Sequence, residues 1–367
     1  MLHRVWAYMA TYTVGVIGTG AAPGGTEQTG YAMGYRHAEA FAALDNCEVA
    51  ACADLVEDHA QRFASEFDID EENVFADYRE MLSAVDLDVV SVTTPIPTHA
   101  PIVIDVANRS DVSAIHCEKP MADTWGDSRL MAQECDRQDV QLTFNHQLRF
   151  DGPTEVAKEL LDEGRIGELE RVEASRRDLF ESGTHQMDIC SYMAGDVPGA
   201  WVLGNVDYRE AELAHGVHIE DQALGLWKYR NGVYGLASTG DGEDAIGCHV
   251  RLRGTGGTIE IRFFGEEKVV VYTGGDREVV ECPSPPRIQG VAADLIACLE
   301  TGEEPRTSAN NTMVATEIMY SIYESSRRRG RVDLPLRVPD NPLIDMLETG
   351  ALQPAGLDTV TDRTVPE

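Results

Sequence analysis

Lysine is scarce in this chain of 367 residues, in which arginine supplies most of the 30 basic side chains. The lysines are Lys119, Lys158, Lys228 and Lys268. Acidic residues number 63, so the formal net charge is −33. They are spread along the whole chain and do not form one tail, which argues against a disordered acidic segment. Nucleic acids and anionic membranes bind positive patches, so this shortage of positive charge excludes both as partners.

Long apolar runs and paired cysteines are also missing. No stretch reaches the length of a membrane span, so the sequence predicts no transmembrane helix. The first residues carry an early arginine, but the apolar run behind them is broken by glycines. We therefore expect no signal peptide and treat residues 1–8 as an extension outside the fold. The eight cysteines contain no CxxC pair, and several, such as Cys52 and Cys298, lie in apolar runs. This pattern predicts buried free thiols in a reducing, cytoplasmic compartment.

The first 148 residues show a regular alternation. Apolar, strand-like runs recur at 12–17, 49–53, 89–93, 112–116 and 140–144. Helical spacing fills the intervals at 32–44, 56–66, 77–85, 101–109 and 125–137. Strands that are apolar throughout and alternate with helices are typical of a parallel sheet covered on both faces. We therefore expect an α/β domain over residues 10–148.

The pattern changes after residue 149. Helices are expected at 155–163 and 184–193, and then strands at 201–208, 222–229, 232–239, 248–254, 258–263 and 268–273. Consecutive strands joined by short turns predict an antiparallel sheet. Helices at 288–301 and 309–330 close this second domain, 149–338, and the polar tail 339–367 is expected on the surface. Two domains agree with a chain that is long for a single core.

A glycine turn follows the first strand-like run. Gly18 and Gly20 fit the first two positions of the dinucleotide-binding fingerprint, but the third position is Pro23. In that fingerprint an acidic residue lies about 20 residues beyond the third glycine, at the end of the second strand. Asp54 ends the second strand-like run, and counting back from it gives Gly34. The fingerprint therefore fits if residues 21–31 are an insertion. A glycine-rich surface loop followed by a chance aspartate is the alternative.

On the fingerprint interpretation, Gly18 and Gly20 form the phosphate-binding turn, and Gly34 gives the close contact between helix and strand. Asp54 accepts hydrogen bonds from both ribose hydroxyls and repels a 2′-phosphate, which favours NAD over NADP as the cofactor. We expect the inserted loop to bulge over the pyrophosphate side of the cofactor or toward the mouth of the active site.

Two further stretches carry residues suited to acid–base chemistry. In "CEKP", Lys119 follows the fourth strand-like run, where ligands bind in such sheets. A lysine retained in a chain that otherwise uses arginine suggests a need for a compact ammonium group, although a surface lysine is the simpler reading. In "ESGTHQMD", His185 lies in the first turn of an expected helix, between Glu181 and Asp188. A histidine beside carboxylates suits general acid–base work, and a structural histidine is the alternative.

These motifs, in this order, resemble the glucose–fructose oxidoreductase / inositol dehydrogenase (Gfo/Idh/MocA) family. The resemblance covers about residues 10 to 350. It rests on Gly18-Thr19-Gly20, Asp54, Thr94-Pro95, His99, Glu118-Lys119-Pro120, the GxHxxD run that ends at Asp188, "RLRGTGGTIEI", and the closing helices. The acidic composition further resembles proteins of salt-accumulating halophiles, in which salt screens the charge repulsion.

The resemblance implies a Rossmann domain followed by an α/β domain with a large, mostly antiparallel sheet, whose open face builds homodimers or homotetramers. It implies NAD(P)-dependent oxidation of a sugar, cyclitol or related polyol hydroxyl. In the implied mechanism His185 takes the hydroxyl proton, Lys119 stabilises the developing alkoxide, and a hydride passes to the nicotinamide. Glu181 stands where the family has an aspartate, and it would orient Lys119 or His185.

The resemblance also assigns contacts to the cofactor and to the substrate. The cofactor group is Thr94, Pro95, His99 and Glu118, and the substrate group is Gln147, Arg149 and Asp188. Arg149 fits a structural ion pair equally well. No metal site is expected, because His215 and His218 lack a third ligand at suitable spacing.

Three features depart from the family: the inserted glycine loop, the glutamate at position 181, and the shortened stretch before His185. That stretch lacks the tryptophan-bearing segment and double glycine that help to wall the substrate pocket, so the sequence does not identify the substrate. Two other functions use the same scaffold. One is a glycosidase that oxidises its substrate transiently with bound NAD, and the other is a non-catalytic NAD(P)-binding sensor. The presence of both Lys119 and His185 disfavours the sensor.

Overall fold

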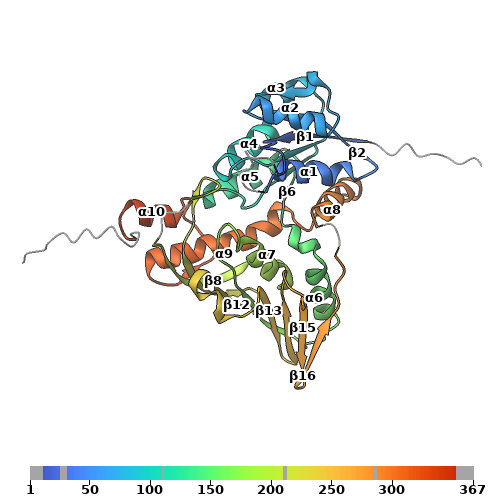
Figure 1. The fold of residues 1–367 in the computed structure, drawn as a ribbon. Helices are drawn as coiled ribbons and strands as arrows, with labels where there is room; N and C mark the ends of the chain where they lie inside the picture. Colours follow the sequence, from blue (N-terminus) through green and yellow to red (C-terminus); the bar gives the residue numbers. More distant parts are fainter. Residues whose placement is uncertain (1–10, 25–30, 110, 210–212, 285–286, 353–367) are drawn as a thin grey trace, which may run out of the picture. The chain divides into compact units, whose positions relative to one another are not determined.

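The computed structural model describes residues 11–24, 31–109, 111–209, 213–284 and 287–352 (Figure 1). By its internal contacts the chain divides into two compact units, and neither is continuous in sequence. Unit 1 comprises Met1–Asp123, Asp127–Glu155 and Pro283–Met313. Unit 2 comprises Thr124–Gly126, Val156–Cys282 and Val314–Glu367. The expected extension 1–8 and the end of the tail, 353–367, lie outside the described residues.

Unit 1 is built on a six-stranded parallel sheet in the order β3-β2-β1-β4-β5-β6. The strands are β1 (Tyr12–Ile17), β2 (Cys47–Ala53), β3 (Val74–Phe75), β4 (Val89–Val92), β5 (Ala114–Cys117) and β6 (Gln141–Phe144). The order reverses between β1 and β4, and in open parallel sheets ligands bind at the carboxyl ends of the strands at such a point. The expected Rossmann fold is confirmed.

Helices cover both faces of this sheet. One face packs against α1 (Met33–Ala42), α2 (Glu57–Glu66) and α8 (Arg287–Thr301), through buried side chains such as Tyr35, Phe63 and Leu295. The other face packs against α3 (Tyr78–Ala84), α4 (His99–Arg109) and α5 (Trp125–Arg137), through side chains such as Met81 and Val103. Two apolar clusters on opposite faces explain why the strands are apolar throughout.

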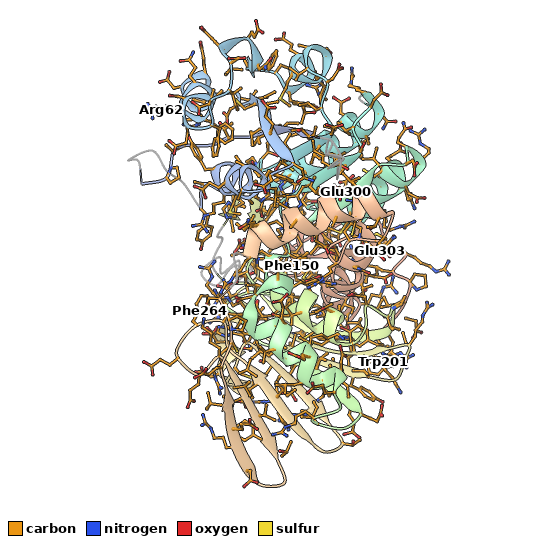
Figure 2. The ribbon with its side chains drawn as sticks, turned by 90° about the vertical axis from the view of Figure 1, so that its right-hand side faces the viewer. Arg62, Phe150, Trp201, Phe264, Glu300 and Glu303 are labelled. Carbon is orange, nitrogen blue, oxygen red and sulfur yellow. The ribbon has the colours of Figure 1, made fainter. Side chains whose placement is uncertain are left out.

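Helix α8 belongs to unit 1, although the sequence pattern had grouped residues 288–301 with the second domain. Its Leu295 and Ile296 are buried in the same apolar cluster as α1. Phe150 lies so close to α8 that a Cβ on Gly290 would be 2.9 Å from the Cβ of Phe150 (Figure 2). The apolar stripe of α8 shows that it is buried, but not against which sheet.

Unit 2 contains a nine-stranded mixed sheet in the order β16-β15-β14-β13-β7-β12-β11-β8-β17. The strands are β7 (Leu169–Ala174), β8 (Gly199–Asp207), β11 (Gln222–Tyr229), β12 (Tyr234–Ser238), β13 (Val250–Gly254), β14 (Gly257–Ile261), β15 (Val269–Thr273), β16 (Asp276–Val280) and β17 (Val332–Asp333). Strands β7 and β12 pair in parallel, and the other pairs are antiparallel. The predicted mostly antiparallel sheet is confirmed, with β7, β16 and β17 as strands that the prediction missed.

The helices of the second half are α6 (Gly152–Asp162), α7 (Thr184–Met193), α9 (Ala309–Arg328) and α10 (Pro342–Glu348). Helix α9 lies against β8 and β11, where a Cβ on Gly225 would be 2.4 Å from Cδ1 of Ile322. Helix α10 occupies part of the expected surface tail, and its Leu343 is fully buried.

Two further expectations concern the chain as a whole. In the part that the structure describes, no helix is both long enough and apolar enough to cross a membrane. Most of the cysteines are buried thiols, namely Cys52, Cys117, Cys135, Cys190, Cys248 and Cys298. Burial raises the pKa of Cys52 and of Cys135 to about 12, which keeps these thiols protonated and unreactive at neutral pH.

Candidate active site

The glycine turn in unit 1 has the backbone conformation that glycine permits. Gly18 and Gly20 have φ of 87° and 68°, in the left-handed region. A Cβ on Gly18 would lie 2.6 Å from Cγ2 of Thr94, at the end of β4, whereas a Cβ on Gly20 would meet nothing within 4 Å. The hydroxyl of Thr93 donates to the carbonyl oxygen of Gly18 over 2.7 Å. The turn is therefore fixed on its β4 side and open at Gly20.

Gly34 lies where an uninterrupted fingerprint would place its third glycine. A Cβ on Gly34 would be 2.7 Å from the carbonyl oxygen of Thr19 and 2.9 Å from that of Gly18. Helix α1 begins at Met33, and its N-cap residue, Ala32, makes no side-chain capping hydrogen bond. The N–H groups at a helix start attract anions such as phosphate. After the insertion at residues 21–31, the start of α1 therefore packs against the glycine turn at Gly18 and Thr19. Residues 25–30 of this insertion lie outside the described residues.

Asp54, directly after β2, lies against the same turn. Its Oδ2 accepts hydrogen bonds from the N–H of Gly20 (2.9 Å) and from the hydroxyl of Thr19 (3.1 Å). Its Oδ1 accepts from the N–H of Val56 (2.9 Å). The next residue, Leu55, is 93% exposed. An exposed leucine beside this carboxylate is a candidate contact that the sequence analysis missed, because position alone did not show its exposure.

Glu118, after β5, is buried and uses both carboxylate oxygens within unit 1. Its Oε1 accepts from Nε2 of His37 (3.0 Å) and from the amide of Asn145 (2.6 Å). Its Oε2 accepts from the N–H of Lys119 (3.1 Å). Burial by itself raises a carboxyl pKa, but the hydrogen bond and charge of His37, with Lys119 and Asn145, hold the pKa of Glu118 well below its ordinary value. This carboxylate joins helix α1 to the lysine segment.

The histidine partner of Glu118 is fully buried on α1. Nδ1 of His37 lies 2.8 Å from the hydroxyl oxygen of Ser91 on β4, and its ring packs at a tilt against His116, with 4.7 Å between centroids. Nδ1 of His116 lies 3.0 Å from the hydroxyl of Thr143. Burial, followed by the neighbouring His37, lowers the pKa of His116 well below its ordinary value. A row of buried polar side chains therefore crosses the carboxyl halves of β4, β5 and β6.

His99 connects two loops rather than presenting its ring nitrogens to solvent. Nδ1 lies 2.9 Å from the carbonyl oxygen of Pro120, and Nε2 lies 2.8 Å from that of Thr94. Burial lowers the pKa of this histidine. Pro95 is exposed beside Thr94, at the end of β4. The segment after β4 and the segment that carries Lys119 are thus held together.

Three more predicted residues lie in unit 1. Lys119 and Gln147 are half-buried, and Lys119 precedes a cis peptide bond to Pro120. Arg149 is fully buried, and its guanidinium donates to the carbonyl oxygen of Arg306 over 2.8 Å. This contact is a hydrogen bond to the backbone and not the structural ion pair that the sequence left open for Arg149.

Unit 2 holds the remaining three predicted residues on and before helix α7. This helix begins at Thr184, so His185 lies in its first turn, as predicted, and Asp188 is buried one turn later. Glu181 is flanked by an arginine and a histidine: Oε2 lies 3.8 Å from Arg177, and Oε1 lies 3.7 Å from Nε2 of His215. No local pattern links His215 to Glu181, which precedes it by more than thirty residues. In the described part of the chain, no group of three or more His, Cys, Asp or Glu side chains could hold a metal ion.

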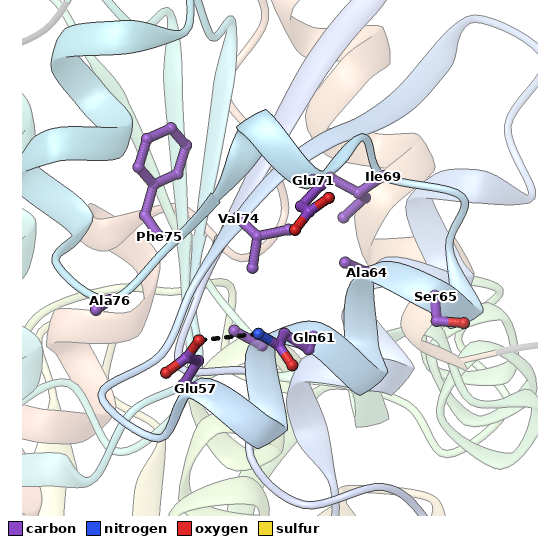
Figure 3. A pocket seen from close by; sticks show the side chains of 10 residues that line it. Glu57, Gln61, Ala64, Ser65, Ile69, Glu71, Val74, Phe75 and Ala76 are labelled. Atoms are coloured by element: carbon purple, nitrogen blue, oxygen red, sulfur yellow. Dashed lines mark hydrogen bonds between the residues drawn. The ribbon is translucent and has the colours of Figure 1, made fainter.

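An open pocket of about 540 Å³ lies on unit 1 between α2 and β3 (Figure 3). Ala60, Ala64 and Val74 form part of its apolar lining, and Glu57 and Gln61 join by a hydrogen bond at one side (2.9 Å). None of the predicted site residues lines it. The predicted residues therefore form two groups, one around the glycine turn and Lys119 in unit 1 and one around His185 in unit 2.

The chain is similar to known proteins in sequence and in fold. Residues 12–146 match the GFO_IDH_MocA model, described as an oxidoreductase family with an NAD-binding Rossmann fold. The chain is 25% identical over 353 residues to D-apiose dehydrogenase of Paraburkholderia graminis, a match that covers 86% of this chain and 91% of that protein. It is 28% identical over 240 residues to inositol 2-dehydrogenase of Gluconacetobacter diazotrophicus, covering 61% of this chain and 65% of that one.

Solved structures share the fold over most of the chain. Levoglucosan dehydrogenase in complex with NADH and levoglucosan has a TM-score of 0.73 at 20% identity, over 89% of this chain and 100% of that one. An oxidoreductase from Agrobacterium radiobacter in complex with NAD+, L-tartaric acid and magnesium has a TM-score of 0.72 at 19% identity, over 88% of this chain and 98% of that one. Fold and family match together define this protein as an NAD-binding oxidoreductase. Residues 12–146 resemble the Gfo/Idh/MocA family, and sugar and inositol dehydrogenases are among the relatives of the chain.

Proposed function

We propose that this protein is an NAD-dependent dehydrogenase that oxidises a hydroxyl of a sugar, cyclitol or related polyol. The observation that carries the proposal is the approach of Gly34 to the turn at Gly18 and Gly20, with Asp54 beside it. Such a turn, at the switch point of a parallel sheet, binds the pyrophosphate of a dinucleotide. Relatives named as apiose and inositol dehydrogenases supply the substrate class.

The residues of unit 1 fit NAD. Gly20 leaves open space beside the turn, and the start of α1 offers N–H groups to the pyrophosphate. Asp54 is followed by two apolar residues, Leu55 and Val56, and its carboxylate would repel a 2′-phosphate, although His59 lies 3.9 Å from its Oδ1. We therefore assign NAD rather than NADP, with Leu55 against the adenine. When bound, NAD supplies the nicotinamide carbon that accepts the hydride.

The catalytic groups would be Lys119 and His185. His185 would act as the general base that takes the hydroxyl proton, and the Lys119 ammonium would stabilise the developing alkoxide. Glu181 would orient this chemistry together with its neighbours Arg177 and His215, both within 4 Å of its carboxylate. Thr94 and Pro95 would lie along the cofactor, with Gln147 and Asp188 toward the substrate.

Glu118, His99 and Arg149 take supporting roles in this proposal. The polar atoms of Glu118 and His99 already have protein partners, and these partners hold the Lys119 segment to α1 and to the end of β4. Arg149 holds the carbonyl oxygen of Arg306. These three residues would therefore act by placing Lys119 and Gln147.

The test is a panel of sugars and cyclitols, with NAD and NADP compared at high salt. Once a substrate is found, Lys119→Ala and His185→Ala should each lower kcat by about 10²–10⁴-fold, the usual contribution of a general acid or base. Lys158→Ala is the matched control, because Lys158 pairs with Asp162 on the surface of α6 and should not affect turnover. Unchanged NADH formation in both catalytic variants would refute the mechanism. Retained NAD with no net NADH would favour the glycosidase.

We further propose that a second copy of the chain covers the open face of the unit 2 sheet. Leu203, Leu224, Leu226 and Tyr234 are exposed side by side on β8, β11 and β12, and Leu203 pairs directly with Leu226. Trp201 lies on the same strand as Leu203 (Figure 2). An exposed apolar patch of this kind is typical of a protein–protein interface.

Charge also favours self-association through this sheet. Glu173 on β7 is 3% exposed and pairs with Arg171, Arg251 and Arg253 at 2.6–3.0 Å. Arginines are thus concentrated on the central strands, although the whole chain carries −33. Two copies would repel each other less strongly here than elsewhere on the surface.

The remaining proposals concern setting and boundaries. The net charge of −33 fits a protein of halophilic type, which should lose stability as salt is removed. Buried thiols fit a reducing cytoplasm. We assign cofactor binding to residues 10–148, and substrate binding and assembly to residues 149–338, with 339–367 as a tail.

A further inference from the structure

Two buried carboxyl groups outside the catalytic set hold the backbone that leads to His185. Asp178, 1% exposed, accepts the N–H groups of Glu181 (2.7 Å) and Ser182 (2.8 Å) on Oδ1. Glu220, 2% exposed, accepts the N–H of Leu179 on Oε1. Glu220 lies between β10 (Val217–His218) and β11, so it reaches this turn from a distant part of the chain.

The turn, residues 178–183, is compact and anchored on α9. The ring of Phe180 packs against Tyr320 at 5.7 Å and against Tyr323 at 6.3 Å between centroids. A Cβ on Gly183 would lie 2.0 Å from the carbonyl oxygen of Asp178, so the turn closes tightly on itself before α7 begins. Because α7 starts at the next residue, any shift of this turn moves His185.

Glu220 faces few groups that could balance a charge. Tyr323 of α9 donates its hydroxyl to Oε2, Leu179 donates its N–H to Oε1, and Asp178 of the turn acts on Glu220 as a like charge. Burial, and next the charge of Asp178, raise the pKa of Glu220 to about 7. The carboxyl is therefore neutral in mild acid. Above neutrality it ionises and adds a second buried negative charge beside Asp178.

We propose that Glu220 is a positioning residue: it holds the 178–183 turn, and with it Glu181 and His185, in the geometry for catalysis, and repulsion between its ionised carboxylate and Asp178 loosens that turn. The proposal rests on the function proposed above, because it takes His185 as the base. The role is indirect. Glu220 acts through the N–H of Leu179 and the hydroxyl of Tyr323.

The first test compares the pH profiles of kcat and KM for Glu220→Gln and the unaltered enzyme. Glutamine keeps an acceptor for Leu179 and offers an N–H to Tyr323, but it cannot ionise. We expect the variant to match the unaltered enzyme below pH 7 and to exceed its kcat by about 3–10-fold above it, because glutamine lacks the repulsion between ionised Glu220 and Asp178. KM for NAD should not change.

Tyr323→Phe tests the direction of the effect. The hydroxyl of Tyr323 lowers the pKa of Glu220, so its removal should move the Glu220 ionisation in the kcat profile to higher pH. Glu173→Gln is the matched control, because Glu173 is an equally buried carboxyl elsewhere in unit 2, with arginine partners. It should leave the pH profile unchanged.

Amide hydrogen exchange separates this inference from the proposed function. In the unaltered enzyme, exchange across residues 178–187 should quicken about 10-fold between pH 6 and pH 8 beyond the intrinsic pH dependence, and Glu220→Gln should remove that excess. Identical exchange and identical kcat profiles in the two proteins would overturn the inference even if His185→Ala were inactive. If His185→Ala and Lys119→Ala had no effect on turnover, while the exchange excess remained, the proposed function would fail and the turn contact would stand.

Discussion

Gly34→Ala is the most direct test of the inserted fingerprint. The substitution adds one methyl group inside α1. Relative to glycine, alanine stabilises a helix interior by about 1 kcal/mol. Here, however, the new Cβ would be 2.7 Å from the carbonyl oxygen of Thr19 and 2.9 Å from that of Gly18. Carbon contacts are optimal near 3.5–4.0 Å, so α1 and the turn would have to separate by roughly 0.5–1 Å.

Overpacking of this kind costs about 1–3 kcal/mol. After the gain in helix propensity, the net loss in the free energy of unfolding should be at most about 2 kcal/mol. If the turn moves to relieve the contact, the same energy is lost from cofactor binding instead. A loss of 1.4 kcal/mol is tenfold in affinity, so the Kd for NADH should rise by up to about 30-fold.

The assay is titration of NADH by its fluorescence, together with denaturant unfolding of the free protein. Gly290→Ala is the matched control, since it adds a methyl group to another helix of unit 1, 2.9 Å from the Cβ of Phe150 and away from the turn. It should lower stability and leave the Kd unchanged. Wild-type affinity and wild-type stability in Gly34→Ala would show that Gly34 is not the third glycine of a dinucleotide site.

Three other predictions follow from buried charges and exposed side chains. Glu118→Gln should lower the free energy of unfolding by about 3 kcal/mol at pH 7, as the breaking of other buried ion pairs does. Because the folded-state pKa of Glu118 is lowered, this difference in stability should shrink below about pH 4.5. Denaturant unfolding at pH 7 and below pH 4.5 measures it. The folded-state pKa of Glu220 is raised to about 7, so stability should fall by up to about 3 kcal/mol as pH rises from 4.5 through 7, and Glu220→Gln should flatten that slope in thermal unfolding. Leu226→Glu should give monomers in sedimentation equilibrium without changing NADH affinity; an unchanged mass would rule out the open sheet face as the interface.

Strand and helix positions in unit 1 were largely predictable from local pattern. The run predicted at 12–17 is β1, and the helix predicted at 125–137 is α5. The strands are apolar throughout because the sheet is buried on both faces, and the helices that cover it are amphipathic. Both patterns can be recognised in the order of residues along the chain. The start of α7 at Thr184 was also predicted, so His185 could be placed in its first turn from sequence alone.

Strand β7 was missed because its alternating residues are charged. Glu173 is buried, but its carboxylate is neutralised by arginines on β7 and β13, and this pairing exists only in the folded sheet. A charged residue in a single sequence gives no sign of such partners. The same applies to α8, whose apolar stripe predicted burial but not the unit that buries it.

The sequence by itself determined the Rossmann fold, the glycine turn and the candidate pair Lys119 and His185, because periodicity and motif spacing are local properties of the chain. Only the tertiary structure decided the partners of those residues. His37 meets Glu118 across 81 positions, and Leu179 meets Glu220 across 41. Contacts at such separations depend on how the sheets bring distant segments together. That folding is also what returned Gly34, after the insertion, to the turn that begins at Gly18.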